Sequence, residues 1–248
     1  MQHFVVVGAG QAGSSLAARL RKEGFDGRIT LVGDEPHLPY QRPPLSKAYL
    51  LGDMALERLF LRPAEFYDSQ RIELALGAAA CDLDTAARRI TVGGETLDYD
   101  ALALTTGSEP RRLPAAIGGD LDGVFVVRGL ADVDAMAPHV RPGARVLIVG
   151  GGYIGLEAAA VAAKRGVAVT VVEMADRILR RVAAPETSDF FRDLHRAHGV
   201  DIREGVGLAR LTGEGRVTGA DLTDGSALEA DFVVIGVGIA PRTDLAEA

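Results

Sequence analysis

The sequence predicts an α/β protein with two dinucleotide-binding folds, because one pattern of strand, glycine turn and helix occurs twice. The first copy begins at Phe4 and reads FVVVGAGQAG, and the second begins at Arg145 and reads RVLIVGGGYIG. In both copies an apolar strand runs directly into G-x-G-x-x-G and a helical pattern follows, which is the context that raises this motif above chance. Two such copies are far more specific than one, and each is expected to form a Rossmann-like unit.

The glycines of the first copy have separate tasks. Gly8 permits a tight turn, Gly10 lets the backbone approach a pyrophosphate, and Gly13 lets the helix pack closely on the strand. Free N–H groups at the helix start then face the phosphate charge. The next strand, expected from Arg28 to Val32, is followed by Asp34, whose carboxylate can accept hydrogen bonds from an adenosine ribose. The first unit is therefore expected to bind an adenine dinucleotide.

The second copy carries the same signals. Its glycines are Gly150, Gly152 and Gly155, and the next strand, expected from Val167 to Val172, ends in the carboxylate of Glu173. A carboxylate at this position favours NADH over NADPH, because it repels a 2′-phosphate. Three arginines that a phosphate would favour follow closely: Arg177, Arg180 and Arg181. These arginines count against a preference for NADH, so NADPH stays as the alternative. NADH is the expected coenzyme because of Glu173.

The remaining elements are expected from periodicity and turn residues. Short strands are expected at 72–76, 89–92 and 232–235, with a buried strand at 99–105. Helices are expected at 45–51, 65–70, 132–140 and 189–198, with the start of a further helix at the end of the chain. Residues 35–44 contain four prolines and are expected to form a loop, and 108–119 is expected to be a connector.

Composition excludes several classes of protein. The 248 residues are 48% hydrophobic and 25% charged, with a net charge of −7, which argues against broad binding to nucleic acid or anionic lipid. No apolar run approaches the ~20 residues of a membrane span, and no leader segment precedes the first strand, so a cytoplasmic protein is expected. The single cysteine, Cys81, excludes an intrachain disulfide and a C-x-x-C pair, and it is expected to be a small buried residue. His195 and His198 share a helix without a third ligand, so no metal site is expected.

A proline-rich run gives the most specific signal. Residues 39–47 read PYQRPPLSK and follow G-D-E at 33–35, and in this they resemble the FAD-dependent ferredoxin reductases among the pyridine nucleotide oxidoreductases. Those enzymes serve bacterial cytochrome P450 and Rieske-type oxygenase systems, and apoptosis-inducing factor shares the motif. The resemblance continues through TTGSEPR at 105–111, GGGYIGLE at 150–157 and residues 236–241, so it covers essentially the whole chain.

The resemblance implies roles for residues of both units. It implies FAD contacts by Gly8, Gly10, Ala12, Gly13, Asp34, Arg42, Lys47, Thr106, Gly107 and Arg111, and by the backbone of Ala80 near the adenine. It implies that Gly150, Gly152 and Gly155 hold the NADH pyrophosphate, that Tyr153 and Ile154 face the nicotinamide, and that Gly236 and Gly238 form a closing turn. An ordinary turn at a strand end is the alternative for the last two.

Lys47 and Glu157 are the two residues that the resemblance implies in catalysis. In the family, the matching lysine lies beside the flavin ring and pairs with the matching glutamate. The physical reason is general, since a cation near the ring favours the electron-rich reduced flavin, and a buried cation needs a partner. Without the motif, both residues would be expected to be solvated charges on helices.

The implied reaction is hydride transfer from NADH to FAD, followed by single-electron transfers to a 2Fe–2S ferredoxin. It needs no side-chain nucleophile or general base. Alternatives with the same two folds are a flavin NADH oxidase, a rubredoxin or nitrite-system reductase, and an NADH-sensing protein of the apoptosis-inducing type. The ferredoxin, the oxygenase and the oligomeric state stay open. A basic patch for an acidic ferredoxin is a candidate at Lys164, Arg165, Arg177, Arg180 and Arg181, with a solvated face as the alternative.

The expected division is linear. Residues 1–112 are assigned to an FAD-binding domain, 113–240 to an NADH-binding domain, and 241–248 to the start of a return to the first domain. Family members continue with a second FAD segment ending in Gly-Asp and with a third domain that covers the flavin. The chain thus resembles about three-fifths of such a reductase, and by itself it is expected to bind FAD weakly and to be a poor reductase.

Overall fold

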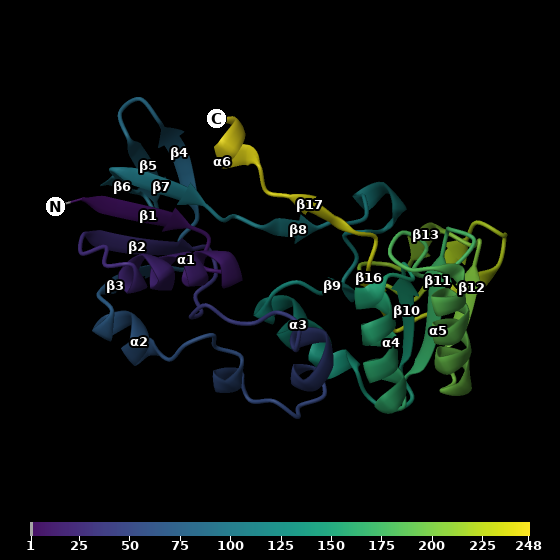
Figure 1. Cartoon of the computed structure of the whole chain (residues 1–248). Helices are drawn as coiled ribbons and strands as arrows, with labels where there is room; N and C mark the ends of the chain where they lie inside the picture. The colour runs from purple at the N-terminus through teal and green to yellow at the C-terminus, as the bar shows by residue number, and fades with distance from the viewer. Residues whose placement is uncertain (1) are drawn as a thin grey trace. The chain divides into compact units, whose positions relative to one another are not determined.

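The computed structural model describes residues 2–248 and contains two compact units (Figure 1). The first unit runs to Arg42 and includes Ala55–Glu109 and Pro241–Ala248, and the second consists of Pro43–Met54 and Pro110–Ala240. This differs from the linear division at residue 112, because Pro43–Met54 leaves the first unit. The π-helical turn of that segment, η1 (Leu45–Tyr49), packs against helices α3 (Leu130–Met136) and α4 (Tyr153–Lys164).

The first unit contains a parallel sheet in the order β3-β2-β1-β7. Its strands are β1 (His3–Val7), β2 (Arg28–Gly33), β3 (Ile72–Leu76) and β7 (Ala101–Leu104). Helix α1 (Gln11–Lys22) lies along one face of this sheet, with α2 (Ala64–Ser69) on the same side (Figure 1). The other face is covered by an antiparallel sheet made of β4 (Ala80–Asp84), β5 (Arg89–Val92) and β6 (Glu95–Asp98). The unit is therefore a three-layer structure with the parallel strands in the middle.

Alternation along β1 explains these layers. Val6 packs with Ala17 and Ile29 on the helical side, whereas Val5 and Val7 pack with Ile90 on the side of the antiparallel sheet. All of these side chains are at most 5% exposed, as expected for a parallel strand that is covered on both faces.

Two predictions for the first unit need correction. Cys81 is exposed rather than buried. It lies on the edge strand β4, where Ala80 and Leu83 face the core, so the thiol points outward and donates a hydrogen bond of 3.2 Å to Asp82. The strand expected to be buried at 99–105 is shorter, and its side chains are only half-buried, because β7 is the last strand of the sheet.

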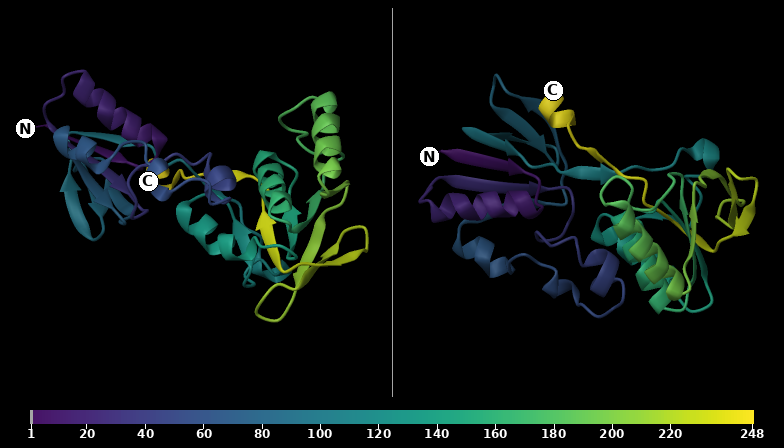
Figure 2. Two further views of the ribbon diagram at one scale, coloured as in Figure 1. Left: turned by 90° about the horizontal axis from the view of Figure 1, so that it is seen from below. Right: turned by 45° about the vertical axis from the view of Figure 1, so that its right-hand side comes forward.

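The second unit contains a five-stranded parallel sheet in the order β12-β11-β10-β16-β9. Its strands are β9 (Val124–Val126), β10 (Arg145–Val149), β11 (Ala168–Glu173), β12 (Asp201–Glu204) and β16 (Phe232–Ile235). Helices α4 and α5 (Pro185–Ala197) lie side by side on one face (Figure 2). An antiparallel sheet of β13 (Leu208–Thr212), β14 (Gly219–Leu222) and β15 (Ala227–Glu229) covers the other, and Leu147 and Val149 pack with its residues.

Short elements complete both units. They are the 3₁₀ turns η2 (Leu56–Arg58), η3 (Ala115–Ile117) and η4 (Ala137–His139), and the terminal helix α6 (Asp244–Glu247). Strands β8 (Ser108–Pro110) and β17 (Ile239–Pro241) pair with each other in the region expected to be only a connector. Among the described residues, no helix combines the length and the apolar character that crossing a membrane requires.

A largely buried ion pair, Arg192–Glu204, connects α5 to the sheet of the second unit. Arg192 donates to both carboxylate oxygens of Glu204, at 2.7 and 3.0 Å, and the two side chains are only 17% and 15% exposed. We expect Arg192→Met to lower the free energy of unfolding of this unit by about 3 kcal/mol, because it leaves the Glu204 charge without its cation. Chemical denaturation measures the change. Arg203→Met, which removes a more exposed pair with Asp201, is the control, with an expected effect below about 1 kcal/mol. Equal effects of the two substitutions would contradict the argument.

Candidate functional site

The glycine turn after β1 borders a pocket of about 610 Å³ in the first unit. Gly8 has a φ of +117°, and a Cβ atom there would lie 2.1 Å from the carbonyl oxygen of Thr105. A Cβ atom at Gly13 would lie 1.9 Å from the carbonyl oxygen of Gly8, whereas at Gly10 it would meet nothing within 4 Å. The fold itself therefore requires glycine at the first and third motif positions. At the middle position, space is left free in front of the turn.

Asp34 lines the same pocket, where the sequence places a ribose-binding carboxylate. Its Oδ2 atom accepts a hydrogen bond of 2.6 Å from Arg242, a residue that the sequence analysis did not single out. Partial burial alone would raise the pKa of Asp34, but the hydrogen bond and charge of Arg242 outweigh it and hold that pKa below its usual value. The carboxylate is therefore charged.

The other residues implied for FAD fall into three groups. Ala80 and Thr106 line the pocket, and Gly107 follows directly and accepts the backbone N–H of Arg242. Ala12 and Arg42 do not line the pocket. Ala12 is exposed on the first turn of α1, and the guanidinium of Arg42 forms an ion pair with Glu35 at 2.6 Å. Arg111 belongs to the second unit, where its backbone N–H donates to the carbonyl of Gly238.

The glycine turn after β10 borders a pocket of about 660 Å³ in the second unit. Gly150, Gly152 and Tyr153 line it, together with Gly236 at the end of β16. Glu173 also lines it, and its carboxylate is held on both oxygens by backbone N–H groups, of Gly151 and of Ala175, each at 2.8 Å. A carboxylate has about four acceptor positions, so two hydroxyl groups of a ribose still have acceptors here.

Both glycine turns lead into helices whose first N–H groups lack side-chain partners. Gly10 is the N-cap of α1 and Gly152 that of α4, and neither helix has a side-chain cap or an acidic residue in its first turn. Unpaired N–H groups and the helix dipole favour an anion at such an end. The two turns thus have the same physical character, which suits the pyrophosphate of a dinucleotide.

Lys47 and Glu157 lie together within the second unit. The Nζ atom of Lys47 donates to the Oε2 atom of Glu157 at 2.6 Å and to the carbonyl of Pro43 at 3.1 Å. Ser46, which the sequence analysis did not single out, donates to the same carboxylate oxygen at 2.7 Å. The lysine side chain is 48% exposed. The pairing is as expected, and its role beside a flavin stays a prediction.

The three arginines after Glu173 differ in the residues that they contact. Arg177 donates to Ser188 at 2.6 Å, and Arg180 pairs with Asp176 at 3.1 Å. Arg181 lines the pocket, and its guanidinium lies near Gly238, where a Cβ atom would be 3.5 Å from it. Arg181 therefore lies beside the turn expected to close over the coenzyme.

Other residues were placed by long-range packing and carried no sequence signal. Leu179, Val182 and Leu208 add apolar surface to the second pocket, and Leu245 of α6 adds it to the first.

Ile154, expected to face a nicotinamide, is 40% exposed and does not line the second pocket. Gly155 is buried under the turn, where a Cβ atom would lie 2.2 Å from the carbonyl oxygen of Gly150. Within residues 2–248 no group of three potential metal ligands comes together.

Comparison with known proteins places this arrangement in a family. The model of the pyridine nucleotide-disulphide oxidoreductases matches residues 2–248. The chain belongs to this family. Within it, the chain is similar to the ferredoxin reductases, the group that the resemblance implied. A ferredoxin–NAD(P)⁺ reductase of Sphingomonas sp. is 45% identical over 96% of the chain and 58% of the relative. Putidaredoxin reductase of Pseudomonas putida is 41% identical over 99% of the chain and 60% of the relative.

Solved structures of family members confirm the α/β fold. The chain matches the reductase fold in the covalent putidaredoxin reductase–putidaredoxin complex with a TM-score of 0.95 and 40% identity, over 99% of the chain and 60% of its counterpart. A ferredoxin reductase from Rhodopseudomonas palustris matches with a TM-score of 0.93 and 39% identity, over 100% and 61%. The chain thus spans about three-fifths of the length of these pyridine nucleotide-disulphide oxidoreductases.

Proposed function

We propose that this protein is an NADH-dependent flavoprotein reductase that passes electrons through FAD to a 2Fe–2S ferredoxin of a P450 or Rieske-type oxygenase system. The observation that carries the proposal is the pair of uncapped glycine turns, each with a carboxylate at the end of the next strand. Two dinucleotide pockets suit a hydride donor and a flavin acceptor. The relatives named above, which are reductases of ferredoxins, support this choice of electron acceptor.

Each residue has a task that follows from its position. Gly10 and the start of α1 hold the FAD pyrophosphate, with Asp34 on the adenosine ribose. Gly152 and the start of α4 do the same for NADH, with Glu173 on its ribose. Bound FAD supplies the chemistry of accepting a hydride and releasing electrons singly. Lys47, oriented by Glu157 and Ser46, supplies a positive charge that favours added electron density on the ring.

Anaerobic stopped-flow spectroscopy tests the proposal with FAD-loaded protein. We expect NADH to bleach the flavin absorbance, and a 2Fe–2S ferredoxin added next to restore it much faster than oxygen does. Faster recovery with oxygen would favour a flavin NADH oxidase. A long-lived charge-transfer complex that reacts with neither acceptor would favour an NADH-sensing protein. Because the chain spans about three-fifths of its relatives, reduction is expected to be slow, and only a complete lack of bleaching at saturating FAD and NADH would overturn the proposal.

Coenzyme preference is expected to follow Glu173 rather than the arginines. Arg177 and Arg180 already have partners, and Arg181 lies at the turn around Gly238, so none is paired with the ribose carboxylate. We expect calorimetry to show NADH binding at least about ten-fold tighter than NADPH, and Glu173→Ser to reduce that ratio to about one. Arg181→Ala is expected to weaken the binding of both coenzymes equally, because we expect Arg181 to face the pyrophosphate, which the two coenzymes share. A selective loss of NADPH binding in Arg181→Ala would show that this arginine reads the 2′-phosphate.

A further inference from the structure

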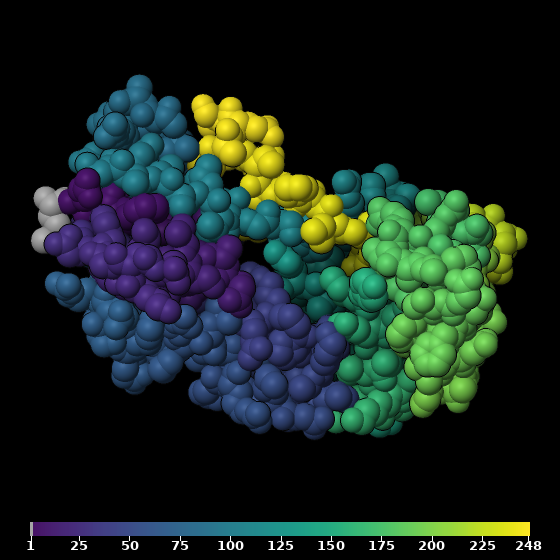
Figure 3. Space-filling view, viewed as in Figure 1, coloured from purple at the N-terminus to yellow at the C-terminus, as the bar shows by residue number. Residues whose placement is uncertain are grey.

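The loop between β11 and α5, residues 174–184, provides one wall of the nucleotide pocket in the second unit. Leu179 and Arg181 are among its residues that line this pocket. Figure 3 shows that the green segment, which contains the loop and α5, lies on the surface of its unit. Surface loops are usually more mobile than the elements that they connect. The contacts that hold this loop therefore determine whether the pocket wall is formed before a coenzyme binds.

Ile178, in the middle of the loop, is held at both of its backbone groups. Its N–H donates to the Oε1 atom of Glu204 at 2.8 Å, and its carbonyl oxygen accepts the hydroxyl of Ser188 at 2.6 Å. Ile178 and Ser188 are fully buried, and Glu204 is largely buried. A buried donor that loses its acceptor costs free energy, so these bonds resist displacement of the loop. One residue of β12 and one of α5 thus fix Ile178 in place.

The next residue connects the loop to the glycine turn. Leu179 has a φ of +55°, a left-handed conformation that such a residue keeps only where its surroundings impose it. Its N–H donates to the carbonyl oxygen of Gly151 at 2.9 Å. The N–H of Gly151 in turn donates to Glu173 at 2.8 Å, the carboxylate that the proposed function assigns to the ribose. Hydrogen bonds and adjacent peptide groups therefore connect Glu204, through Ile178 and Gly151, to Glu173.

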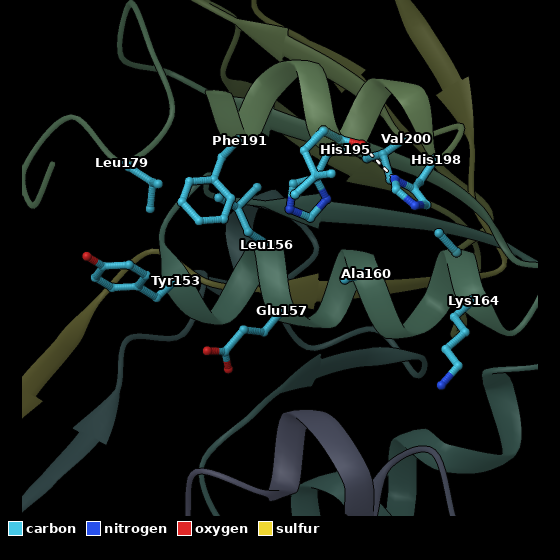
Figure 4. A pocket seen from close by; sticks show the side chains of 12 residues that line it. Tyr153, Leu156, Glu157, Ala160, Lys164, Leu179, Phe191, His195, His198 and Val200 are labelled. Atoms are coloured by element: carbon cyan, nitrogen blue, oxygen red, sulfur yellow. Dashed lines mark hydrogen bonds between the residues drawn. The ribbon is translucent and has the colours of Figure 1, made fainter. Parts of the chain in front are cut away.

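Packing connects the same residues. A Cβ atom at Gly151 would lie 2.6 Å from the Cγ2 atom of Ile178, so the loop lies directly against the glycine turn. Leu179 is buried and lines the groove between α4 and α5 as well as the nucleotide pocket, and Figure 4 shows it among the residues of this groove, with Tyr153 and Phe191. Because closely packed interiors transmit displacements, a shift of Ile178 would move both the turn and the pocket wall.

We propose that Glu204 is a positioning residue for NADH, which acts through Ile178 on the ribose carboxylate of Glu173 and on the wall of the pocket. Glu204 does not line the pocket, so its effect on the coenzyme is indirect. As a charged acceptor it forms a stronger hydrogen bond with the Ile178 N–H than a neutral group would, and Arg192 balances its buried charge. The inference rests on the proposed binding of NADH in this pocket.

Two double variants separate the acceptor from the ion pair. Arg192→Met/Glu204→Met and Arg192→Met/Glu204→Gln both remove the pair without leaving a buried charge, and only the second keeps an oxygen that can accept the Ile178 N–H. We expect the first to bind NADH about ten-fold more weakly than wild type and the second to stay within about three-fold of it. ADP-ribose, which has the ribose and the pyrophosphate without the nicotinamide, is expected to show the same losses. Calorimetry on the whole chain measures both ligands, and thermal unfolding checks that each variant is folded.

The outcomes distinguish this inference from the proposed function. If wild type binds NADH and the folded Met/Met variant binds it equally well, Glu204 has no positioning role, while the proposed function stands. Equal losses in the Met/Gln variant would overturn the inference as well, because the ion pair would then matter only for stability. A loss for NADH without a loss for ADP-ribose would also contradict it. If wild type binds neither ligand, the proposed function fails and this inference with it.

Hydrogen exchange of the wild-type chain provides a test that needs no variant. We expect the backbone amides of Ile178 and Leu179 to be protected before any coenzyme is added, because their acceptors are Glu204 and Gly151 of the protein itself. Exchange of these amides as fast as in an unfolded chain would show that the pocket wall is not formed in advance, and would overturn the inference.

Discussion

Gly155→Ala is expected to destabilise the second unit by more than about 3 kcal/mol, whereas Gly152→Ala is expected to change its stability by less than about 1 kcal/mol. A Cβ atom at Gly155 would lie 2.2 Å from the backbone oxygen of Gly150, and a backbone atom cannot move aside as a flexible side chain can. At Gly152 nothing lies within 4 Å, and the residue does not have a left-handed φ. Urea denaturation of the two variants measures the difference.

NADH affinity is expected to show a second contrast between the same two variants. In Gly152→Ala the added methyl group occupies the space through which a pyrophosphate approaches the start of α4, so NADH binding should fall at least about ten-fold in a stable protein. Calorimetry with NADH measures this. Normal NADH affinity of Gly152→Ala would mean that the coenzyme does not lie over this turn. The first unit allows the same pair of measurements, of stability and of FAD affinity. A Cβ atom in Gly13→Ala would lie 1.9 Å from the carbonyl oxygen of Gly8, whereas in Gly10→Ala it would meet nothing within 4 Å.

Lys47→Met is expected to slow flavin reduction by NADH about 100-fold in FAD-loaded protein, the range found when one charged or hydrogen-bonding group facing developing charge is removed. The side chain keeps its apolar stem and loses the ammonium group that Glu157 and Ser46 orient. A more negative midpoint potential of the bound flavin is the expected accompanying change, because reduced flavin loses a favourable charge. Anaerobic stopped-flow spectroscopy and redox titration provide the two measurements.

Glu157→Gln separates charge from position at the same place. The amide keeps the size of the side chain but no longer balances the lysine, so we expect a smaller effect, about ten-fold, on the reduction rate. Lys22→Met, at the exposed end of α1, removes the same charge elsewhere and is the control. A hydride-transfer rate that is unaltered in Lys47→Met would remove its proposed role, while the glycine-turn results would be unaffected.

Local pattern explains which parts of this protein were predictable. Each glycine turn combines a strand, a turn and a helix start in adjacent residues, so Gly8, Gly155 and the carboxylates of Asp34 and Glu173 were found in sequence and lie where expected. The strands of β13 to β15 were missed, because they are short and carry charged residues on their exposed face. Such strands lack the apolar run that identifies a parallel core strand.

Long-range packing explains what the sequence could not supply. Arg242 reaches Asp34 from the far end of the chain, and Ser46 reaches Glu157 across more than a hundred residues. Cys81 was expected to be buried because cysteine usually is, but its exposure depends on which face of an edge strand it occupies.

The chain passes between its two units after Arg42, Met54, Glu109 and Ala240. Lys47 is encoded among residues of the first unit but belongs to the second, where it meets Glu157. A gene fragment for residues 110–240 alone would therefore encode the glutamate without its lysine. Each unit is made of separate stretches of the sequence, so recombination at one breakpoint cannot replace a whole unit. A breakpoint between Lys47 and Glu157 would also take the two partners of the ion pair from different parents. The two units are therefore expected to be inherited together.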